Sequence, residues 1–437
     1  MTGAMAFLVA TAAAAPRVLI LGGTGRIGSA VASHLLTCPI DITLAGRSVD
    51  RGEAAVREVL GERSADAVAS VSFLKLDFRD EDALRTAMRG TAAVVHTAGP
   101  YAGEQPTVLK VALAESVPAY VDLSDPLEYL DAAKKIGQEA LNSNACETLA
   151  LCAGGAFPGL SNVLAMECVA RLGDRGVKDV DFSYFTAGLG GSGEINLFIT
   201  NDGFGCEVPV YRNGEFAPSL DAGSRERATG KSRVEFFLAE SDPSARLVGE
   251  RAVWSWPFPE GALIPRQVTG GISGSSSVGM GTAPDIWNEV MGIMVDVVPR
   301  AWWRSAAFSN GLAKFSKPLV DFTDRFVGET HAMRIDVTSE DGSRVSAVQA
   351  HESFRRCVGM SCAEFTRALL ETKGLLPPNA KDTAGATMHG SLPSAGTFTP
   401  EELFATQEVR GLMLDRLLAM PGTLNAGFEE VLHDQDK

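Results

Sequence analysis

The sequence lacks the residue patterns that hold metal ions, disulfide frameworks and nucleic acids. Its seven cysteines contain no C-x-x-C pair, and its six histidines lie far apart. Scattered cysteines in an odd number are typical of reduced thiols, and we predict no metal site. The 437-residue chain carries 54 Asp and Glu against 39 Lys and Arg, a formal net charge of −15. This acidity, without a basic patch interleaved with aromatic residues, argues against nucleic acid as a partner.

Long apolar runs are missing too. No segment reaches 18 apolar residues without a charge, so the sequence predicts no transmembrane segment. Residues 1–15 are uncharged and mostly apolar, but they lack the basic start of a secretory signal and the Arg and Ser of a transit peptide. We interpret them as an N-terminal extension, with a trimmed targeting sequence as the alternative. The expected location is the cytoplasm, or the plastid if the chain comes from a photosynthetic eukaryote.

What the sequence does contain is a glycine-rich turn between a strand and a helix. Residues 18–21 form a short apolar run typical of a buried strand, and apolar residues recur at helical spacing after the turn. Glycines at a G-x-G-x-x-G spacing permit the turn, the approach of a pyrophosphate and close packing of the helix on the strand. The helix N-terminus offers N–H groups to the phosphates. The predicted dinucleotide cradle consists of Gly22, Gly23, Thr24, Gly25, Arg26, Ile27 and Gly28. The alternative is a turn that holds no ligand.

The end of the next predicted strand favours NADP over NAD. An NAD site usually places Asp or Glu about 20 residues beyond the glycines. This chain carries Arg47 and Ser48 in that region. A guanidinium and a hydroxyl suit a 2′-phosphate, whereas a carboxylate would repel one. The alternative is that Arg47 is a solvated residue of a loop.

Strand and helix patterns alternate through residues 16–171. This alternation predicts an α/β fold with a doubly wound parallel sheet, a Rossmann domain that binds NADP. Ligands of such sheets lie at the carboxyl ends of the strands. We therefore expect Asp77 near the adenine and Ala98, Gly99 and Pro100 beside the nicotinamide.

The pattern of predicted strands and helices changes in residues 172–350. Alternating strands and hairpin signals, one of them at Asn213-Gly214, predict an α+β domain with a mostly antiparallel sheet. We expect this domain to bind the substrate or to form a dimer interface. Residues 351–437 are predicted as C-terminal helices that return to the Rossmann domain.

Seven segments together carry a family resemblance: "VLILGGTGRIGSAV", "ITLAGRS", "VVHTAGPY", "AYVDLSD", "GAFPGLSN", "DRFVGE" and "GTFTPEELF". They resemble the saccharopine dehydrogenase-like (saccharopine reductase) oxidoreductases, and the chain is most similar to their cyanobacterial and plastid branch. The resemblance implies a Rossmann domain interrupted by an α+β domain, and reduction of an imine formed from an amino acid and an aldehyde. Short-chain dehydrogenases also use "GGTGRIG", but they usually place Lys four residues after a catalytic Tyr. None of the five tyrosines has that spacing.

Catalytic residues are the least defined part of the prediction. Imine reduction needs a proton donor near the nitrogen and cations for the substrate carboxylates. Tyr101, Asp122 and Asp125 lie at predicted strand ends and are weak candidates. Their alternative roles are core packing for Tyr101 and helix capping for the two Asp residues. Ser161 and Asn162 are candidates for substrate or cofactor contact, or they only shape a turn.

Two functions from different classes are consistent with these patterns. The first is an NADP(H)-dependent oxidoreductase that acts on a C–N or related bond of a small-molecule substrate. The second is a dinucleotide-binding protein without turnover that attaches peripherally to membranes or lipid bodies. Residues 286–308 favour the second because they gather three of the five tryptophans with other apolar residues. Their alternative role is a core helix or a homodimer interface.

Overall fold

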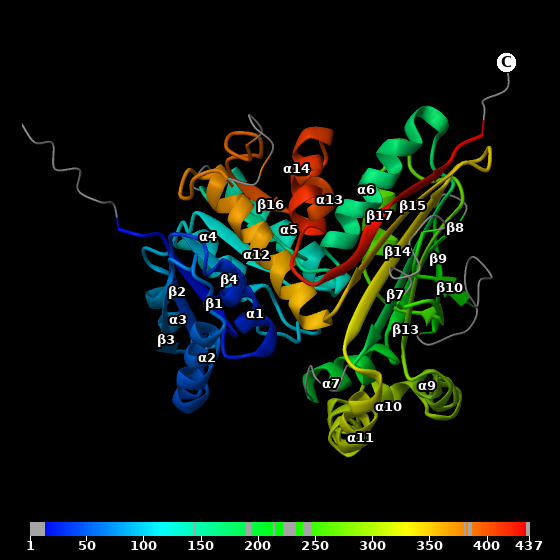
Figure 1. The fold of residues 1–437 in the computed structure, drawn as a ribbon, viewed down its shortest axis with the longest axis horizontal. Helices are drawn as coiled ribbons and strands as arrows, with labels where there is room; N and C mark the ends of the chain where they lie inside the picture. The colour runs from blue at the N-terminus through cyan, green and yellow to red at the C-terminus, as the bar shows by residue number, and fades with distance from the viewer. Residues whose placement is uncertain are drawn as a thin grey trace, which may run out of the picture.

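Two β-sheets with their helices form the computed structural model, the first sheet around the blue N-terminal strands and the second in green and yellow (Figure 1). The structure describes residues 14–143, 146–188, 194–212, 215–221, 233–238, 247–379, 382 and 387–433.

The first sheet has seven parallel strands in the order β16-β6-β5-β4-β1-β2-β3. Most of these strands are short apolar runs that helices cover from both sides, and residues 18–21 of β1 are at most 1% exposed. The strands are β1 (Arg17–Leu21), β2 (Asp41–Gly46), β3 (Ser70–Lys75), β4 (Ala93–His96), β5 (Ala119–Asp122), β6 (Leu149–Leu151) and β16 (Gly396–Phe398). The helices between them are α1 (Arg26–Leu35), α2 (Val49–Gly61), α3 (Glu81–Met88), α4 (Thr107–Ala114), α5 (Leu127–Asn142) and α6 (Leu160–Leu172).

The seventh strand comes from far along the chain. β16 pairs with β6 in parallel, and Thr397 lies opposite Ala150. The long helix α12 (Phe354–Thr372) packs against α1. The two helices approach so closely at Gly359 that a Cβ there would lie 2.6 Å from the Cβ of Ala30. Residues 354–398, which come long after the other six strands in the sequence, therefore complete the first sheet.

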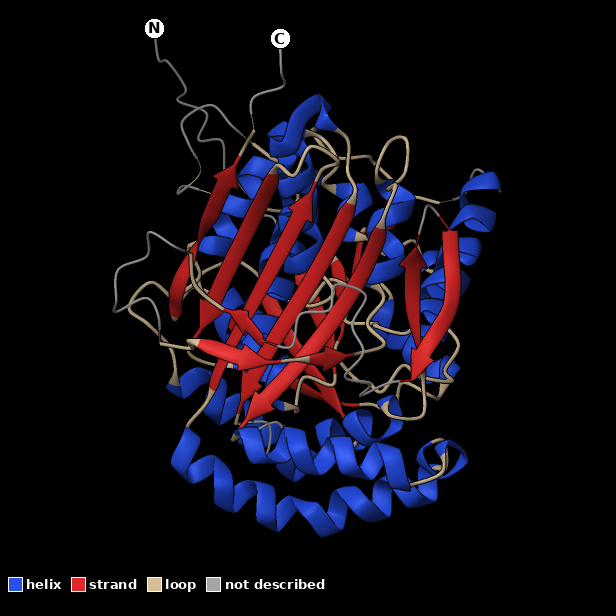
Figure 2. Cartoon of the chain, turned by 90° about the vertical axis from the view of Figure 1, so that its right-hand side faces the viewer, coloured by secondary structure: helices blue, strands red, loops and turns tan. Residues whose placement is uncertain are grey.

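The second sheet has eight strands and is mostly antiparallel (Figure 2). Its main path runs β17-β15-β14-β7-β13-β8-β9, and β12 pairs with β13. The exception is the parallel pair of β7 and β13. The strands are β7 (Asp179–Ala187), β8 (Glu207–Arg212), β9 (Glu215–Asp221), β12 (Trp254–Ser255), β13 (Ser275–Ala283), β14 (Thr330–Thr338), β15 (Arg344–His351) and β17 (Thr423–Val431), and a separate pair consists of β10 (Arg233–Glu235) and β11 (Glu250–Ala252). The predicted α/β fold class, a Rossmann sheet with an α+β part built on a mostly antiparallel sheet, is confirmed.

Helices at one end of the second sheet form a separate layer, seen at the bottom of Figure 1. They are α7 (Glu194–Gly203), α9 (Asp285–Val297), α10 (Arg300–Trp303) and α11 (Ala306–Val327). The remaining short elements are η1 (Gly173–Arg175), α8 (Glu260–Gln267), α13 (Pro400–Leu403) and α14 (Gln407–Leu418). In the part of the chain that the structure describes, no helix has the length and apolar character needed to cross a membrane.

The C-terminal region differs from its prediction as a set of helices. Residues 423–431 form β17, which pairs with β15 of the second sheet and puts Phe428 opposite Ala347. The physical reason is a period of two in the apolar residues Leu424, Ala426 and Phe428, which suits a strand better than a helix. The hairpin signal at Asn213-Gly214 lies outside the described residues.

One continuous apolar core joins the two sheets. The same cluster of buried residues includes Ile20 of β1, Leu164 of α6 and Ile335 of β14. Helix α6 makes this connection because it follows β6 of the first sheet and packs against β14 and β15 of the second. The edge of the first sheet and the second sheet are therefore held in a fixed relation.

Candidate dinucleotide and substrate site

The glycine-rich turn packs the start of α1 tightly against β1. Gly22 has φ +76°, and a Cβ there would lie 2.9 Å from the backbone nitrogen of Ala98. A Cβ on Gly28 would lie 2.5 Å from the carbonyl oxygen of Gly22 and 2.7 Å from the Cα of Gly23. These contacts require glycine for packing, whatever the turn binds.

Gly25 has a different environment, because a side chain at this position would point into largely empty space. It is the N-cap of α1 with φ −90° and ψ 162°, and the carbonyl oxygen of Gly22, at 3.1 Å, is the one neighbour within 4 Å of a Cβ built there. No side chain caps this helix, and its first turn holds no acidic residue. The N–H groups of Arg26, Ile27 and Gly28 lie in that first turn, where a helix provides them with no acceptor. The turn therefore fits the pyrophosphate of a dinucleotide.

The end of β2 lies against this turn. A Cβ on Gly46 would lie 2.8 Å from the hydroxyl oxygen of Thr24, so the two segments are in contact. Arg47 follows and is exposed, and among the residues that the structure describes no carboxylate pairs with it. Ser48 caps α2, because its Oγ accepts a hydrogen bond from the N–H of Arg51 at 3.4 Å. Part of the hydrogen-bonding capacity that we predicted for a 2′-phosphate is therefore used locally.

The other predicted cofactor residues lie at the same edge of the sheet, where β3 and β4 end. Asp77 is exposed, and its carboxylate accepts the N–H of Arg79 at 3.1 Å. The half-buried residues Ala98, Gly99 and Pro100 follow β4, with a cis peptide bond between the last two. The structure thus brings together the glycine-rich turn, Arg47, Asp77 and this segment at the carboxyl ends of four neighbouring strands.

Two of the three candidate catalytic residues are buried in structural roles. Tyr101 is 6% exposed, donates to the carbonyl of His96 at 2.6 Å and accepts the N–H of Leu123 at 3.3 Å. Burial raises its pKa well above the ordinary value, so its hydroxyl is a poor proton donor at this site. Asp122 is 0% exposed and accepts bonds from the N–H and Oγ of Ser124 and from the N–H of Ala153. Both residues tie neighbouring strand ends together.

Asp125 is the candidate that keeps access to solvent. It is half-buried, and burial, together with the negative charges of Asp122 and Asp202, raises its pKa to about 6. Pro126 occupies the cap position of α5, and no side chain caps that helix, so Asp125 does not have the predicted capping role. Asp202 lies in α7, and burial raises its pKa as well, while Arg304 lowers it. Sequence reasoning missed Asp202 because no spacing or motif links it to the first sheet.

Ser161 and Asn162 lie in a buried polar network rather than in an open cleft. Asn162 accepts the N–H of Gly159 at 2.9 Å and donates to Glu401 at 2.8 Å. Ser161 donates at 3.0 Å to Glu260, which also accepts the hydroxyl of Tyr184 at 2.7 Å. Burial raises the pKa of Glu260 to about 7 and that of Glu401 to about 7. This network connects α6, α8 and α13, so both residues shape the junction between the two halves.

Comparison with known proteins points to the first sheet. Residues 18–115 match the NAD dependent epimerase/dehydratase family. No curated protein is significantly similar to the chain. The match covers the region from β1 through α4 and ends before the second sheet begins. Residues 18–115 are therefore similar to the Rossmann domains of NAD dependent epimerases and dehydratases.

Part of the chain is also similar to several solved structures. A ketoreductase domain from the bacillaene assembly line is 16% identical, with a TM-score of 0.26, over 31% of this chain and 43% of that chain. A metagenomic short-chain oxidoreductase in complex with NADP is 14% identical, with a TM-score of 0.24, over 31% and 81%. The UDP-Glc/GlcNAc 4-epimerase from Campylobacter jejuni is 15% identical, with a TM-score of 0.25, over 39% and 65%. The chain thus spans less than half of the ketoreductase domain that it matches.

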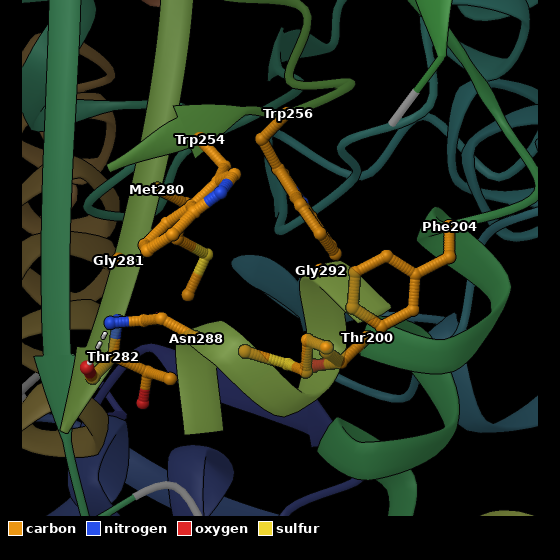
Figure 3. Close-up of a pocket in the computed structure, with 10 residues that line it drawn as sticks. Thr200, Phe204, Trp254, Trp256, Met280, Gly281, Thr282, Asn288 and Gly292 are labelled. Atoms are coloured by element: carbon orange, nitrogen blue, oxygen red, sulfur yellow. Dashed lines mark hydrogen bonds between the residues drawn. The ribbon is translucent and has the colours of Figure 1, made fainter. Parts of the chain in front are cut away.

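Two adjoining cavities lie between the end of the second sheet and the layer of helices α7, α9, α10 and α11. Figure 3 shows the residues that line the smaller one. Thr200 of α7 and Phe204, which directly follows that helix, line both cavities. The same helix carries Asp202, whose charge acts on Asp125 at the end of β5. Within the described ranges, no group of three or more His, Cys, Asp and Glu side chains is arranged to hold a metal ion.

Proposed function

We propose that the protein is an NADP(H)-dependent oxidoreductase of the saccharopine dehydrogenase-like type that acts on a C–N bond of a small metabolite. The observation that carries the proposal is the open N-terminus of α1 at Gly25, beside the exposed guanidinium of Arg47. This pair offers N–H donors to a pyrophosphate and a cation to a 2′-phosphate. Seven of the eight strands of the second sheet lie between β6 and β16 in the sequence, which supports the interrupted Rossmann domain that this family resemblance implies.

Each segment at the edge of the first sheet has a distinct task in this proposal. The first turn of α1 binds the pyrophosphate, Arg47 binds the 2′-phosphate, and Asp77 lies on the adenine side. Residues 98–100 hold the nicotinamide end. When bound, the cofactor supplies or accepts a hydride, while the protein orients it and excludes water.

The acidic groups near the end of β5 favour C–N chemistry. An imine is reduced most readily as its cationic iminium form, which a neighbouring carboxylate stabilises. Asp125 and Asp202 supply two such groups from different halves of the chain. With its pKa raised to about 6, Asp125 can hold or release a proton at its carboxyl oxygen near neutral pH. We therefore assign it the proton exchange with the substrate nitrogen.

The test separates cofactor binding from turnover. NADPH and NADH are titrated by fluorescence, and NADPH oxidation is followed with a panel of amino acids paired with aldehydes. We expect Asp125→Asn to bind NADPH normally and to lose about 100-fold or more in turnover. The control Asp66→Asn changes an exposed carboxylate and should leave both properties unchanged. Undiminished turnover by Asp125→Asn would remove that residue from the mechanism, and absence of turnover with every imine would remove the substrate class.

A second candidate function has its own support. Helices α9 and α11 expose apolar stripes, in which Ile293 is 60% exposed, Val297 74%, Phe315 82% and Phe326 75%. Stripes of this kind suit peripheral attachment to a membrane or lipid body by a dinucleotide-binding protein without turnover. Flotation with liposomes tests it, since the wild-type protein should float and Phe315→Ser should not. A homodimer formed through these stripes would instead show as a doubled mass in light scattering.

The proposed location follows from the same two functions. We place the protein in the cytoplasm, or in the plastid if the chain comes from a photosynthetic eukaryote. A fluorescent fusion of the full chain tests this placement.

A further inference from the structure

We propose that the two adjoining cavities under α9 and α11 form one pocket for a neutral molecule with a hydrocarbon chain. The inference goes beyond the proposed function, because it concerns a binding site in the second half of the chain. It rests on the shape of the pocket, the chemistry of its walls and one buried donor without an acceptor.

The cavities lie next to each other. They share four lining residues, Thr200, Phe204, Thr282 and Met291. The space that protein atoms do not fill is about 430 Å³ in the smaller and about 690 Å³ in the larger, and in both it includes some open solvent. The rings of Trp256 and Phe204 border the space in Figure 3. An elongated ligand would fill both parts at once.

The walls of this pocket are apolar and adaptable. Aromatic and methionine side chains cover most of them, which suits flexible hydrocarbon chains because thioethers adjust their shape to the ligand. The apolar lining includes Leu197, Phe204, Trp254, Trp256, Met280, Trp287, Met291, Met294, Trp303, Leu312 and Val320. The amide of Asn288 is occupied, since it donates to the carbonyl of Thr282 at 2.8 Å and accepts its N–H at 3.0 Å. The amide of Asn201 likewise donates to the carbonyl of Ser309.

One buried hydrogen-bond donor on the pocket wall indicates which polar group the hydrocarbon ligand carries. The side chain of Trp303 is 1% exposed, and its Nε1–H has no hydrogen-bond partner among the described residues. By contrast, the Nε1–H of Trp287 donates to Thr323 at 3.0 Å. A buried donor without an acceptor destabilises the unliganded protein, and a ligand oxygen would supply the missing acceptor. The described lining includes no Lys, Arg or His that could pair with an anionic head, so an ester, ketone or aldehyde fits better than a carboxylate.

The outer faces of the covering helices are consistent with an apolar ligand. Val290 lines the larger cavity and is also 37% exposed, so the pocket reaches the surface beside α9. There it meets the exposed stripes that include Ile293 and Phe322. An apolar chain would pass along this surface without full exposure to water.

The experiment uses the full chain and the methyl ester of cis-parinaric acid, a conjugated fatty chain that fluoresces in apolar surroundings. We expect saturable binding with energy transfer from tryptophan, because Trp254, Trp256, Trp287 and Trp303 line the pocket. The free acid should bind about tenfold more weakly than the ester, because its carboxylate would be buried without a cation among the described lining residues. Equal binding of acid and ester would overturn the neutral head.

Matched variants locate the site. Met291→Trp and Leu312→Trp fill the pocket from opposite walls, and each should weaken binding by about tenfold or more, even if the other fails to fold. Val297→Trp places the same side chain on the exposed face of α9 and should change the affinity by less than about twofold. Circular dichroism checks the fold of each variant.

Substitutions in the exposed apolar stripe of α11 test whether the ester binds to the protein surface instead. A double variant, Phe315→Ser with Phe322→Ser, should keep its affinity for the ester. If it loses binding while the pocket variants keep theirs, or if binding does not saturate, the ester adsorbs to the surface and the proposal is wrong. NADPH titration of the same samples is a separate readout, so failure of the cofactor proposal would not be mistaken for failure of the pocket.

Discussion

Substitution at Gly25 separates the binding role of the glycine-rich turn from its structural role. Its φ of −90° and ψ of 162° lie in the region that β-branched residues prefer, so Gly25→Val introduces no backbone strain. The carbonyl oxygen of Gly22, at 3.1 Å, is the one atom within 4 Å that a Cβ would meet. We expect the free energy of unfolding to fall by only about 1 kcal/mol, the cost of a poorer N-cap.

The effect of the same substitution on NADPH binding should be far larger. The new methyl groups would occupy the space in front of the first-turn N–H groups and displace the pyrophosphate. Loss of two charge-assisted hydrogen bonds at about 1.5–3 kcal/mol each amounts to at least about 3 kcal/mol. The dissociation constant should therefore rise by about 100-fold or more.

A neighbouring glycine serves as the control. In Gly28→Ala the new Cβ would lie 2.5 Å from the carbonyl oxygen of Gly22, so overpacking should lower stability by about 1–3 kcal/mol. Thermal unfolding and fluorescence titration of NADPH measure the two quantities for both variants. If Gly25→Val binds NADPH with the wild-type affinity, the turn does not hold the dinucleotide.

Three further predictions concern the cofactor, the architecture and the pH dependence. Arg47→Asp should weaken NADPH by about 100-fold and NADH by less than about threefold, and equal wild-type affinities for the two cofactors would contradict the 2′-phosphate role. A chain that ends at Gly359 lacks β16 and β17, so it should aggregate and lose NADPH binding; a monodisperse product that binds normally would rule out the interrupted domain. Because burial raises the pKa of Glu260 from 4.5 to about 7, its contribution to stability is present below pH 4.5 and is lost as the pH rises through 7. In the wild-type protein the free energy of unfolding, measured with urea, should therefore fall by about 3 kcal/mol between pH 4.5 and 8. Glu260→Gln should abolish this fall, and an unchanged pH profile would argue against this carboxyl.

The first sheet was predictable because its signals are local. Buried parallel strands give continuous apolar runs. The glycines of the turn, among them Gly22 and Gly28, have a spacing in the sequence that only a few structures require. Even the capping of α2 by Ser48 follows from residue type and position. The sequence also indicated that residues near strand ends would meet at one edge.

The proposed substrate side was not predictable, because its parts meet only in the folded chain. Asp125 and Asp202 come from different halves, and neither lies in a motif that names the other. Tyr101 and Asp122 lie near strand ends, as expected, but burial gives them structural hydrogen bonds that a linear pattern does not reveal. The strand at residues 423–431 was not predicted. The apolar residues of α14 have helical spacing, and the alternation typical of a strand begins only after that helix.

The late position of β16 has a consequence for synthesis on the ribosome. Residues 396–398 pair with β6, whose own strand ends at Leu151, so this sheet edge waits for most of the chain to be translated. During that time β6 presents unpaired backbone groups, which are a template for pairing with other nascent chains. The second sheet waits longer still, for β17 at residues 423–431. Shielding by a chaperone until the last strands emerge would therefore matter more for yield than the final stability of either sheet.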